Sequence, residues 1–538
     1  MKTIYTNAKV YTGTLPLQQA FSEENGVICA VGSNAELLQT CAEGDQVVDL
    51  KGGFVCPGFI DSHMHVLNYG KFLQNADLSQ HTDSLEGMLA YVSDFAAQHP
   101  PKGNEWIIGR GWNHDYFTDT NRIPTRWDLD RISTEYPVVL TRCCGHALTI
   151  NSKAIELLGL TADTPQPEGG AIGIVDGQPD GIVLDNSMNM VYEAIPLPDK
   201  ESVKQMIRLS CKALNKVGIT EAHSDDYESY PALPWQVVKA AFEELEAEGT
   251  LTVRVYEQSN FPTLEGLKEF VAAGNNTGVG SPMFRTGPLK IVGDGSLGAR
   301  TAYMSAPYAD DASTCGFPLF SQQEMDDLIG YAHSIGMQVA VHCIGDKSVD
   351  MVLDAVEKAQ KVNPRDDHRH GIVHCQVTRG DQLQRLADMN MHIYAQSIFI
   401  DYDSHIVEAR VGKEKASTSY SWKTLLQSGL SVSNGTDCPV ERPDPLRSMQ
   451  CAVTRRSLDQ SNQPYLPHEA FTVQEALDSY TIHGAIASFE ENSKGRIQPG
   501  YVADFVVLGQ DPFQTDAEAL KDIPVLATYL GGKAVFQG

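Results

Sequence analysis

Apolar runs that end in polar residues recur along the middle of the chain, and stretches of helical periodicity lie between them. HGIVHCQV at residues 370–377 is one such run, and QEMDDLIGYAHSI at 323–335 is an amphipathic stretch. This alternation of strands and helices is typical of α/β folds with a parallel sheet. There are eight candidate strands, which is the number that a (β/α)8 barrel requires. They lie at residues 58–66, 137–146, 218–226, 287–296, 337–346, 370–377, 392–400 and 430–440.

Both ends of the chain show a different pattern, with short β-type runs separated by turn residues. Two β-rich ends that flank a long middle predict one small β-domain assembled from both termini. The runs lie at residues 2–10, 26–32, 46–50, 503–508 and 524–536.

The predicted fold class is therefore α/β: a TIM barrel with insertions, plus a small composite β-sandwich domain. The separations between residues 66 and 137 and between 146 and 218 are too long for one helix and one loop. We expect insertions there that cover the barrel mouth. The predicted boundaries are residues 1–55 and 490–538 for the β-sandwich domain and 56–489 for the barrel domain, with insertions near 70–136 and 147–217.

The charge of the chain narrows the class of partner. Of its 538 residues, 41 are Lys or Arg and 69 are Asp or Glu, so its net charge is −28. A surface this acidic repels phosphate backbones and anionic lipids. This argues against nucleic acid or a membrane as the principal partner. The partner expected from the chemistry described below is a small-molecule substrate.

Cysteine usage and the N-terminal sequence together predict the cellular compartment. The 11 cysteines form no CxxC motif, as expected of reduced thiols rather than a disulfide framework. The N-terminus lacks the apolar segment of a signal peptide, and no run approaches the ~20 apolar residues of a membrane span. We therefore expect a cytoplasmic protein, with a homodimer as the default oligomeric state.

The strongest local motif is the HxH pair of His63 and His65. Two histidines at i and i+2 on a strand point to the same face, so both can reach one ion or be satisfied by hydrogen bonds at the barrel mouth. His342, His374 and Asp437 each follow an apolar run. A barrel brings these strand ends together, and the resulting nitrogen and oxygen ligands suit zinc.

Lys290 is the second unusual residue, because it lies inside the apolar run GPLKIV. Burying an ammonium group is costly, so one interpretation is a lysine that snorkels or forms a salt bridge. The alternative is a neutral lysine that takes up CO₂ and becomes N6-carboxylysine. The two oxygens of that carbamate can bridge two metal ions, so Lys290 would complete a dinuclear site.

Four further residues are candidates for substrate binding. His146 ends an apolar strand and could donate a hydrogen bond to a substrate oxygen, while Trp112 and His114 lie in the first insertion and could line the pocket. Arg300 follows the Gly-rich DGSLG loop, where it could clamp a carboxylate or brace that loop. For all four residues the alternative is loop packing.

Eight motifs carry a family resemblance. They are PGFIDSHMH (57–65), GWNHD (111–115), GHALTINSKA (145–154), LKIVGDGSLGARTA (289–302), VHCIGD (341–346), RHGIVHCQ (369–376), NGTDCPV (434–440) and KGRIQPGYVADFVVL (494–508). On these motifs the chain resembles the amidohydrolase superfamily, and more narrowly its YtcJ-like branch, which includes N-substituted formamide deformylases. The DGSLGARTA segment is the most branch-specific, and the resemblance covers nearly the whole chain.

The resemblance implies a TIM barrel, a composite β-sandwich domain and divalent metal, usually zinc. It also implies a role for each candidate ligand: His63, His65 and Asp437 hold one buried ion, His342 and His374 hold a second, and carboxylated Lys290 bridges them. Two positions depart from the family pattern. Relatives usually have Glu where this chain has Val373, which bears on the second metal, and Glu where it has Asp185, which bears on the pocket lid.

The expected function is metal-dependent hydrolysis of a non-peptide C–N bond in an amide or an N-formyl or N-acyl amine. A metal-bound water becomes hydroxide near neutral pH. Asp437, as general acid and base, would take the proton of this nucleophile and deliver it to the leaving nitrogen. Asp61 and Asp346 could support the histidine ligands, or serve as turn and N-cap carboxylates.

Two alternative functions remain open. One is a mononuclear aminohydrolase (a deaminase) acting on an amidine-like ring, although deaminases of this superfamily generally lack the bridging lysine that Lys290 would supply. The other is a non-catalytic regulatory protein on the same scaffold, against which the presence of every proposed ligand argues.

Overall fold

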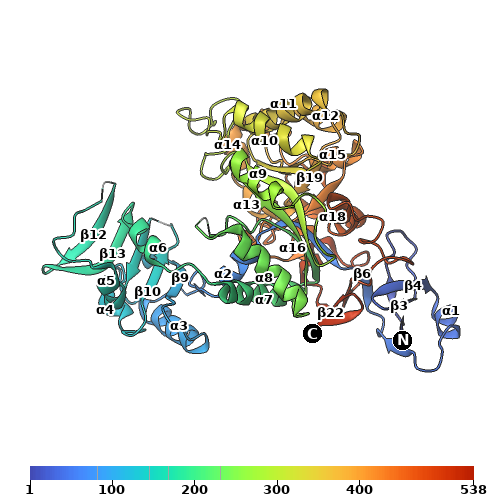
Figure 1. Cartoon of the computed structure of the whole chain (residues 1–538), viewed down its shortest axis with the longest axis horizontal. Helices are drawn as coiled ribbons and strands as arrows, with labels where there is room; N and C mark the ends of the chain where they lie inside the picture. The colour runs from blue at the N-terminus through green and yellow to red at the C-terminus, as the bar shows by residue number, and fades with distance from the viewer. Residues whose placement is uncertain (82, 145, 168, 231) are drawn as a thin grey trace. The chain divides into compact units, whose positions relative to one another are not determined.

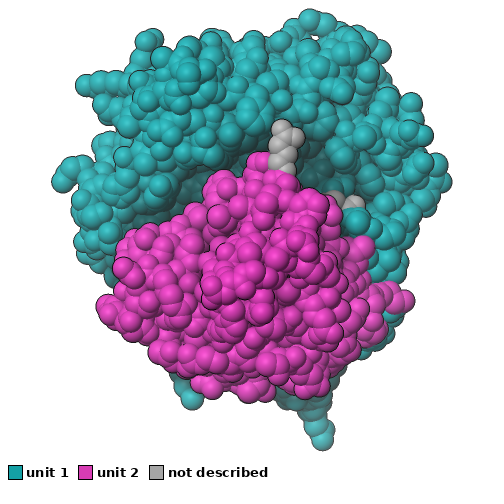
Figure 2. Space-filling view, turned by 90° about the vertical axis from the view of Figure 1, so that its left-hand side faces the viewer, with its two compact units in different colours: residues 1–67, 207–538 teal, residues 68–206 magenta. Residues whose placement is uncertain are grey.

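The computed structural model describes residues 1–81, 83–144, 146–167, 169–230 and 232–538. These residues form two compact units, which Figure 2 shows in different colours. Unit 1 comprises residues 1–67 and 207–538, and unit 2 comprises residues 68–206. Each unit has a sheet and a hydrophobic core of its own, as described below.

A parallel barrel sheet forms the centre of unit 1 (Figure 1). Within the described residues the sheet has eight strands, in the order β20-β19-β18-β17-β16-β15-β14-β7, and every neighbouring pair is parallel. The N–H of Asp437, just after β20, donates to the carbonyl of His63 in β7 at 2.8 Å, which joins the two end strands. The strands are β7 (Phe59–Met64), β14 (Ile219–Ser224), β15 (Arg254–Asn260), β16 (Phe284–Val292), β17 (Val339–Cys343), β18 (Gly371–His374), β19 (His392–Ala395) and β20 (Val432–Asn434).

Amphipathic helices connect the barrel strands. In α11 the buried residues Val349, Val352, Leu353 and Val356 follow the i, i+3, i+4, i+7 spacing that places them on one face. No helix in the described part of the chain is long and apolar enough to cross a membrane. The connecting helices are α7 (Lys200–Lys216), α8 (Trp235–Ala247), α9 (Leu264–Ala272), α10 (Gln322–Ser334), α11 (Asp346–Val362), α12 (Gly380–Asp388), α13 (Ile400–Asp403), α14 (Val407–Ala416) and α15 (Trp422–Gln427). After the last strand follow α16 (Pro445–Thr454), α17 (Val473–Ser479) and α18 (Ile482–Ala487).

The barrel prediction is confirmed, but one of its eight strands was wrongly assigned. The run at 137–146 forms β10 (Val138–Arg142), which pairs with β9 and β11 in the sheet of unit 2. Its place in the barrel is taken by β15, whose seven residues are all buried. Because Glu257, Gln258 and Ser259 interrupt the apolar pattern of β15, the sequence RVYEQSN does not read as a barrel strand.

Strands from both ends of the chain share one core in unit 1. The described residues there form two further sheets, in the orders β4-β3-β1-β5 and β2-β6-β21-β22-β23. The rings of Phe505 and Tyr529 stack at 4.3 Å, and Tyr5 stacks on Phe21 at 4.7 Å. The strands are β1 (Lys2–Thr6), β2 (Lys9–Val10), β3 (Ala20–Glu24), β4 (Val27–Gly32), β5 (Gln46–Asp49), β6 (Phe54–Pro57), β21 (Phe505–Leu508), β22 (Val525–Leu530) and β23 (Lys533–Gln537), with α1 (Asn34–Gln39) between β4 and β5.

Unit 2 contains most of both predicted insertions, together with β10 between them. Its described residues form one sheet in the order β12-β13-β11-β10-β9-β8, so the two insertions build a single sheet around β10. Buried side chains such as Leu140 and Leu148 pack on its two sides. Its elements are β8 (Ala76–Asp77), α3 (Leu85–Gln98), β9 (Ile107–Trp112), α4 (Arg126–Leu129), β10, β11 (Ala147–Ile150), α5 (Ser152–Leu158), β12 (Gly170–Val175), β13 (Gln178–Asp185) and α6 (Met188–Ala194); α2 (Val66–Leu73) precedes them.

Candidate metal centre

The HxH pair and Asp437 meet where the first and last strands of the barrel join. Oδ1 of Asp437 lies 3.1 Å from Nε2 of His65 and 3.4 Å from Nε2 of His63. His63 is 1% exposed, and Asp437 is 8% exposed. Both imidazoles therefore reach one carboxylate oxygen, as expected of an i, i+2 pair on one strand face.

His342 and His374 bring a second pair of imidazoles to the same barrel end. Nε2 of His374 lies 2.9 Å from Nδ1 of His342. The rings of His374 and His63 are 5.6 Å apart, so the two pairs adjoin. The potential ligand atoms of His63, His374 and Asp437 all lie within 4.8 Å of one another, and all three residues are buried.

Each of the four histidines has one ring nitrogen against a protein acceptor. The acceptors are Oε1 of Gln258 for His63 Nδ1, the Asp225 carbonyl for His65 Nδ1, the Gly295 carbonyl for His342 Nε2 and Oε1 of Gln396 for His374 Nδ1. These contacts assign the ring N–H to that side, so the other nitrogen of each ring presents a lone pair. Nε2 of His63 lies near both Oδ1 of Asp437 and Nζ of Lys290. Nδ1 of His342 and Nε2 of His374 face each other, and a cation would satisfy both of these lone pairs.

The pKa values of three candidate ligands, His63, His374 and Asp437, also suit a metal ion. Burial lowers the pKa of His63 well below its usual value, and it lowers the pKa of His374 to about 4. Burial also opposes a charge on His65, but the hydrogen bond to Asp437 outweighs it and raises the pKa of His65 to about 9. The pKa of Asp437 stays well below its usual value, because the surrounding histidines outweigh its burial. His63, His374 and Asp437 therefore have the forms that bind a metal, a neutral imidazole or an ionised carboxylate, whereas His65 carries a proton that a metal would displace.

Lys290 lies inside the barrel on β16 and is 2% exposed. Its Nζ is 3.1 Å from Nε2 of His63 and 3.8 Å from Oδ2 of Asp225. Burial lowers the pKa of the Lys290 ammonium group. The structure therefore brings all six predicted ligands to one end of the barrel: His63, His65, Lys290, His342, His374 and Asp437.

Two of these ligands have left-handed backbone conformations, with φ of 73° at His374 and 57° at Asp437. Such values are costly for residues other than glycine and cluster at functional sites. Val373 packs with Ala340, which is two residues before His342 and shares its strand face. The turn at His374 thus lets Val373 and His374 both face the interior, although a regular strand would separate them.

The carboxylates that support the ligands are Asp61 and Asp294. Asp61 accepts hydrogen bonds from the N–H groups of His63 and Thr436, which fixes the two segments that carry the HxH pair and Asp437. Oδ1 of Asp294 lies 3.5 Å from Nε2 of His342. Asp346, which the sequence suggested for this role, instead pairs with Arg379 and Lys415.

The predicted substrate contacts Trp112, His114 and His146 belong to unit 2. Trp112 is fully buried in the core of that unit, and its Nε1–H donates to a β10 backbone carbonyl at 3.0 Å. His114 accepts a hydrogen bond from Arg142 at 3.4 Å. His146 is exposed, with Nδ1 3.1 Å from Oδ1 of Asp185. Contact of these residues with a substrate stays a prediction.

Arg300 lies in the loop between β16 and α10 of unit 1. Its Nε and Nη2 donate to the two carboxylate oxygens of Asp310 at 3.0 and 2.9 Å, and Arg410 binds the same carboxylate. These contacts favour the interpretation in which Arg300 braces its own loop. Its binding of a substrate carboxylate stays a prediction.

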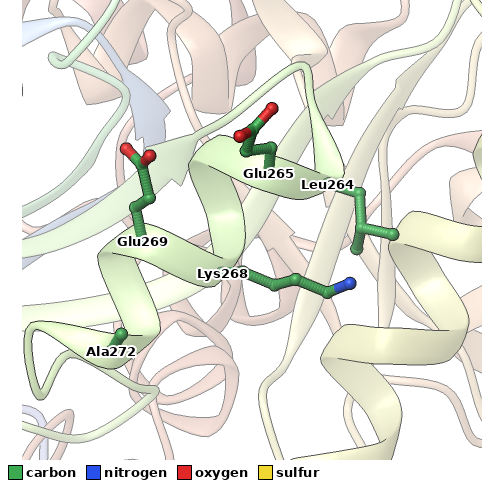
Figure 3. A pocket seen from close by; sticks show the side chains of 5 residues that line it. All are labelled: Leu264, Glu265, Lys268, Glu269 and Ala272. Atoms are coloured by element: carbon green, nitrogen blue, oxygen red, sulfur yellow. The ribbon is translucent and has the colours of Figure 1, made fainter.

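A surface pocket lies on α9, outside the barrel (Figure 3). It is lined by residues of that helix alone: Leu264, Glu265, Lys268, Glu269 and Ala272. Lys268 extends toward α10, where its Nζ lies 5.6 Å from the ring centre of Tyr331. None of the candidate ligands lines this pocket, so it is separate from the metal centre.

A sequence model of the amidohydrolase family matches residues 46–536. The chain belongs to the amidohydrolase family. It is 33% identical over 542 residues to the putative amidohydrolase YtcJ of Bacillus subtilis, with all of both chains covered. It is 26% identical to the N-substituted formamide deformylase of Arthrobacter pascens, over 98% of this chain and 97% of that one.

A solved structure agrees with the family assignment. The crystal structure of an uncharacterized metal-dependent hydrolase from Pyrococcus furiosus is 30% identical and superposes with a TM-score of 0.78, covering 96% of this chain and 100% of that one. This amidohydrolase is therefore a hydrolase on an α/β barrel. Five supporting residues of its site were not expected from the sequence: Asp225, Gln258, Asn260, Asp294 and Gln396.

Proposed function

We propose that this amidohydrolase hydrolyses a non-peptide C–N bond, in an amide or an N-formyl or N-acyl amine, with the help of zinc. The observation that carries the proposal is the cluster of His63, His374 and Asp437 ligand atoms within 4.8 Å, with His65, His342 and Lys290 beside it. The N-substituted formamide deformylase of Arthrobacter pascens supports the choice of bond, since its name describes cleavage of such a compound.

The residues present fit one or two zinc ions. Imidazole nitrogens and a carboxylate suit zinc, and the free ring nitrogens of His342 and His374 face each other at 2.9 Å. His63, His65 and Asp437 would hold one ion, and His342 and His374 a second. Lys290, as N6-carboxylysine, would lie between them. When bound, zinc supplies a Lewis acid and lowers the pKa of water.

Asp437 is the proposed general base and acid. Its carboxylate is ionised and lies at the barrel end, where His65 and His63 hold Oδ1 from one side. It can therefore accept a proton from the attacking water and return it to the leaving nitrogen. His146, Trp112, His114 and Arg300 are the proposed substrate contacts, although the first three lie in unit 2 and Arg300 already binds Asp310.

The test is a substrate screen on purified, zinc-loaded protein, beginning with N-formyl and N-acyl amines and including amidine-like rings. We expect carboxylate and amine release from the first group, and loss of activity by at least about 100-fold in Asp437→Asn. Asp388→Asn, which changes an exposed carboxylate on α12, is the matched control.

Other outcomes distinguish the alternative functions. Ammonia release from amidine-like rings with one metal ion per chain would identify a deaminase and overturn the proposal. Turnover of an amide that Asp437→Asn leaves unchanged would remove Asp437 from the mechanism. A zinc-loaded protein that hydrolyses no member of the panel would favour a non-catalytic role.

A further inference from the structure

Asp225 is a buried carboxylate at the metal centre that the proposed reaction does not yet use. It follows β14 directly and is 5% exposed. Its Oδ2 lies 3.8 Å from Nζ of Lys290 and accepts a hydrogen bond from Asn260 at 3.2 Å. Its Oδ1 is buried and has no hydrogen-bond partner among the described residues. A carboxylate oxygen in that position is costly unless a donor reaches it.

The backbone holds Asp225 in place from both sides. The hydroxyl of Ser224 accepts the N–H of Val66 at 2.7 Å, and Asp226 accepts the N–H of Leu67 at 2.8 Å. These two bonds fasten the end of β14 to the segment that follows the HxH pair. The N–H of Asp225 also donates to the carbonyl of Met64 at 3.0 Å. Because Ser224 and Asp226 bind that segment, Asp225 between them is free to face Lys290.

Asp225 contacts two of the proposed ligands at once. Its carbonyl oxygen lies 2.9 Å from Nδ1 of His65, which directs Nε2 of that ring toward Asp437. Its carboxylate faces Lys290, while Asn260 on β15 holds Oδ2 from the other side. Asp225 therefore links the position of an imidazole ligand to that of Lys290.

We propose that Asp225, held by Asn260, is a positioning residue that orients carboxylated Lys290 toward the metal ligands. The inference rests on the proposed function, which includes the carbamate. The neutral Lys290 amine attacks CO₂, an N–C bond forms, one C=O electron pair moves to oxygen, and one proton leaves the nitrogen for water. The product keeps a single N–H.

That N–H can donate to the Asp225 carboxylate, whose Oδ2 lies 3.8 Å from Lys290 Nζ. A carbamate is planar, so an N–H directed at Asp225 turns the two carbamate oxygens away from it. Repulsion between the two anions acts in the same direction. Nε2 of His63 lies 3.1 Å from Lys290 Nζ, so this proposed ligand adjoins the nitrogen that would bear the carbamate. In the proposed arrangement Asp225 aims both oxygens at the metal cluster.

The experiment measures the carbamate directly rather than activity. The full-length protein is reconstituted with zinc and ¹³C-bicarbonate, the carbamate signal is quantified by ¹³C NMR, and zinc is counted by elemental analysis. Asp225→Asn should lower the carbamate occupancy at a fixed bicarbonate concentration by about tenfold, the loss expected for one hydrogen bond to a charged group. Asn260→Ala should lower it less, and Asp225→Glu should restore part of it.

Asp388→Asn is the matched control, because it makes the same exchange at an exposed carboxylate on α12, away from Asp225 and Lys290. Circular dichroism establishes that each variant is folded, and Asn260→Ala carries the test if Asp225→Asn is not. A folded Asp225→Asn with wild-type carbamate would overturn the inference. So would loss of zinc with the carbamate retained, since Asp225 would then act on the metal itself.

Failure of the inference is distinguishable from failure of the proposed function. Wild-type protein that hydrolyses amides with an unmodified Lys290 would overturn the positioning role and leave the hydrolysis standing. A carbamate that depends on Asp225, in a protein that hydrolyses no amide, would overturn the proposed hydrolysis and leave the positioning role standing.

Discussion

Lowering the pH from 7 to 5 should destabilise unit 1, because three buried histidines are held neutral: His333 in α10 and His368 and His370 just before β18. The N–H of Val339 donates to Nδ1 of His370, so Nε2 of that ring carries the proton and donates to Nδ1 of His333 at 2.8 Å. Nε2–H of His333 donates to the carbonyl of Asn363 at 2.6 Å. A second proton on His333 or His370 would oppose one of these donors.

His368 is fixed in the same way and allows the effect to be worked out. Its Nδ1 accepts the N–H of His370, and its Nε2–H donates to the carbonyl of Met389. Burial lowers the pKa of His368 to about 4. In the unfolded chain a histidine has a pKa of about 6.5. Between these values the unfolded state binds a proton that the folded state does not, so the free energy of unfolding falls as the pH falls.

The magnitude follows from the two pKa values. His368 alone should cost about 2 kcal/mol of stability between pH 7 and pH 5. Burial also lowers the pKa values of His333 and His370, which adds to the loss. Nearby charged groups are Arg365, which lowers the pKa of His368 further, and Asp367, which raises it.

The assay is urea unfolding of the zinc-loaded protein, followed by circular dichroism at several pH values from 7 to 5. His368→Gln keeps an acceptor and a donor but does not titrate, so its stability should fall by about 2 kcal/mol less than that of the wild type over this range. His468→Gln, which replaces a histidine whose side chain is 66% exposed, is the control and should follow the wild type. Identical pH dependence in His368→Gln and wild type would refute this account of His368.

Two further predictions concern packing around the barrel. Gly435→Ala would place a Cβ 2.5 Å from the backbone nitrogen of His63. We therefore expect zinc occupancy to fall and the free energy of unfolding to drop by about 2 kcal/mol. Zinc content by elemental analysis and thermal unfolding that both match the wild type would contradict this. Asp504→Asn removes the negative charge and one of the two oxygens that accept hydrogen bonds from Arg254, whose side chain is 9% exposed. It should cost about 3 kcal/mol, because the guanidinium stays buried without its counter-charge. The double variant with Arg254→Met should lose less than this single variant in urea unfolding; an equal or larger loss would mean that the buried charge is not the cause.

The barrel and its ligands could be predicted because their signals are local. An apolar run closed by a histidine or an aspartate marks both a strand and the residue at its carboxyl end, as at His342 in β17. The HxH pair needs only strand alternation to bring His63 and His65 to one face. The left-handed turn at His374 has no such signal, since nothing in GIVHC distinguishes it from a regular strand.

The unit 2 sheet was harder to predict, because its strands come from both sides of β10 and pair across long loops. β10 is an apolar run followed by polar residues, which is the pattern used to identify barrel strands. Only its pairing with β9 and β11 distinguishes it from them. Cytoplasmic location and a homodimer stay predictions from the sequence.

The missed barrel strand and two of the missed site residues have one cause. Gln258 and Asn260 lie two apart on β15, so they share a face, and they bind His63 and Asp225 respectively. The polar side chains that support the site therefore remove the apolar pattern by which the strand would be identified. The spacing between predicted strands offered the missing signal. The segment from residue 226 to residue 287 is too long for one helix and one loop, as are the two segments predicted to be insertions. In a barrel whose interior holds a metal centre, a polar segment of strand length within an overlong connection is itself a candidate strand. Its alternate residues are candidates for the side chains that hold the metal ligands in place.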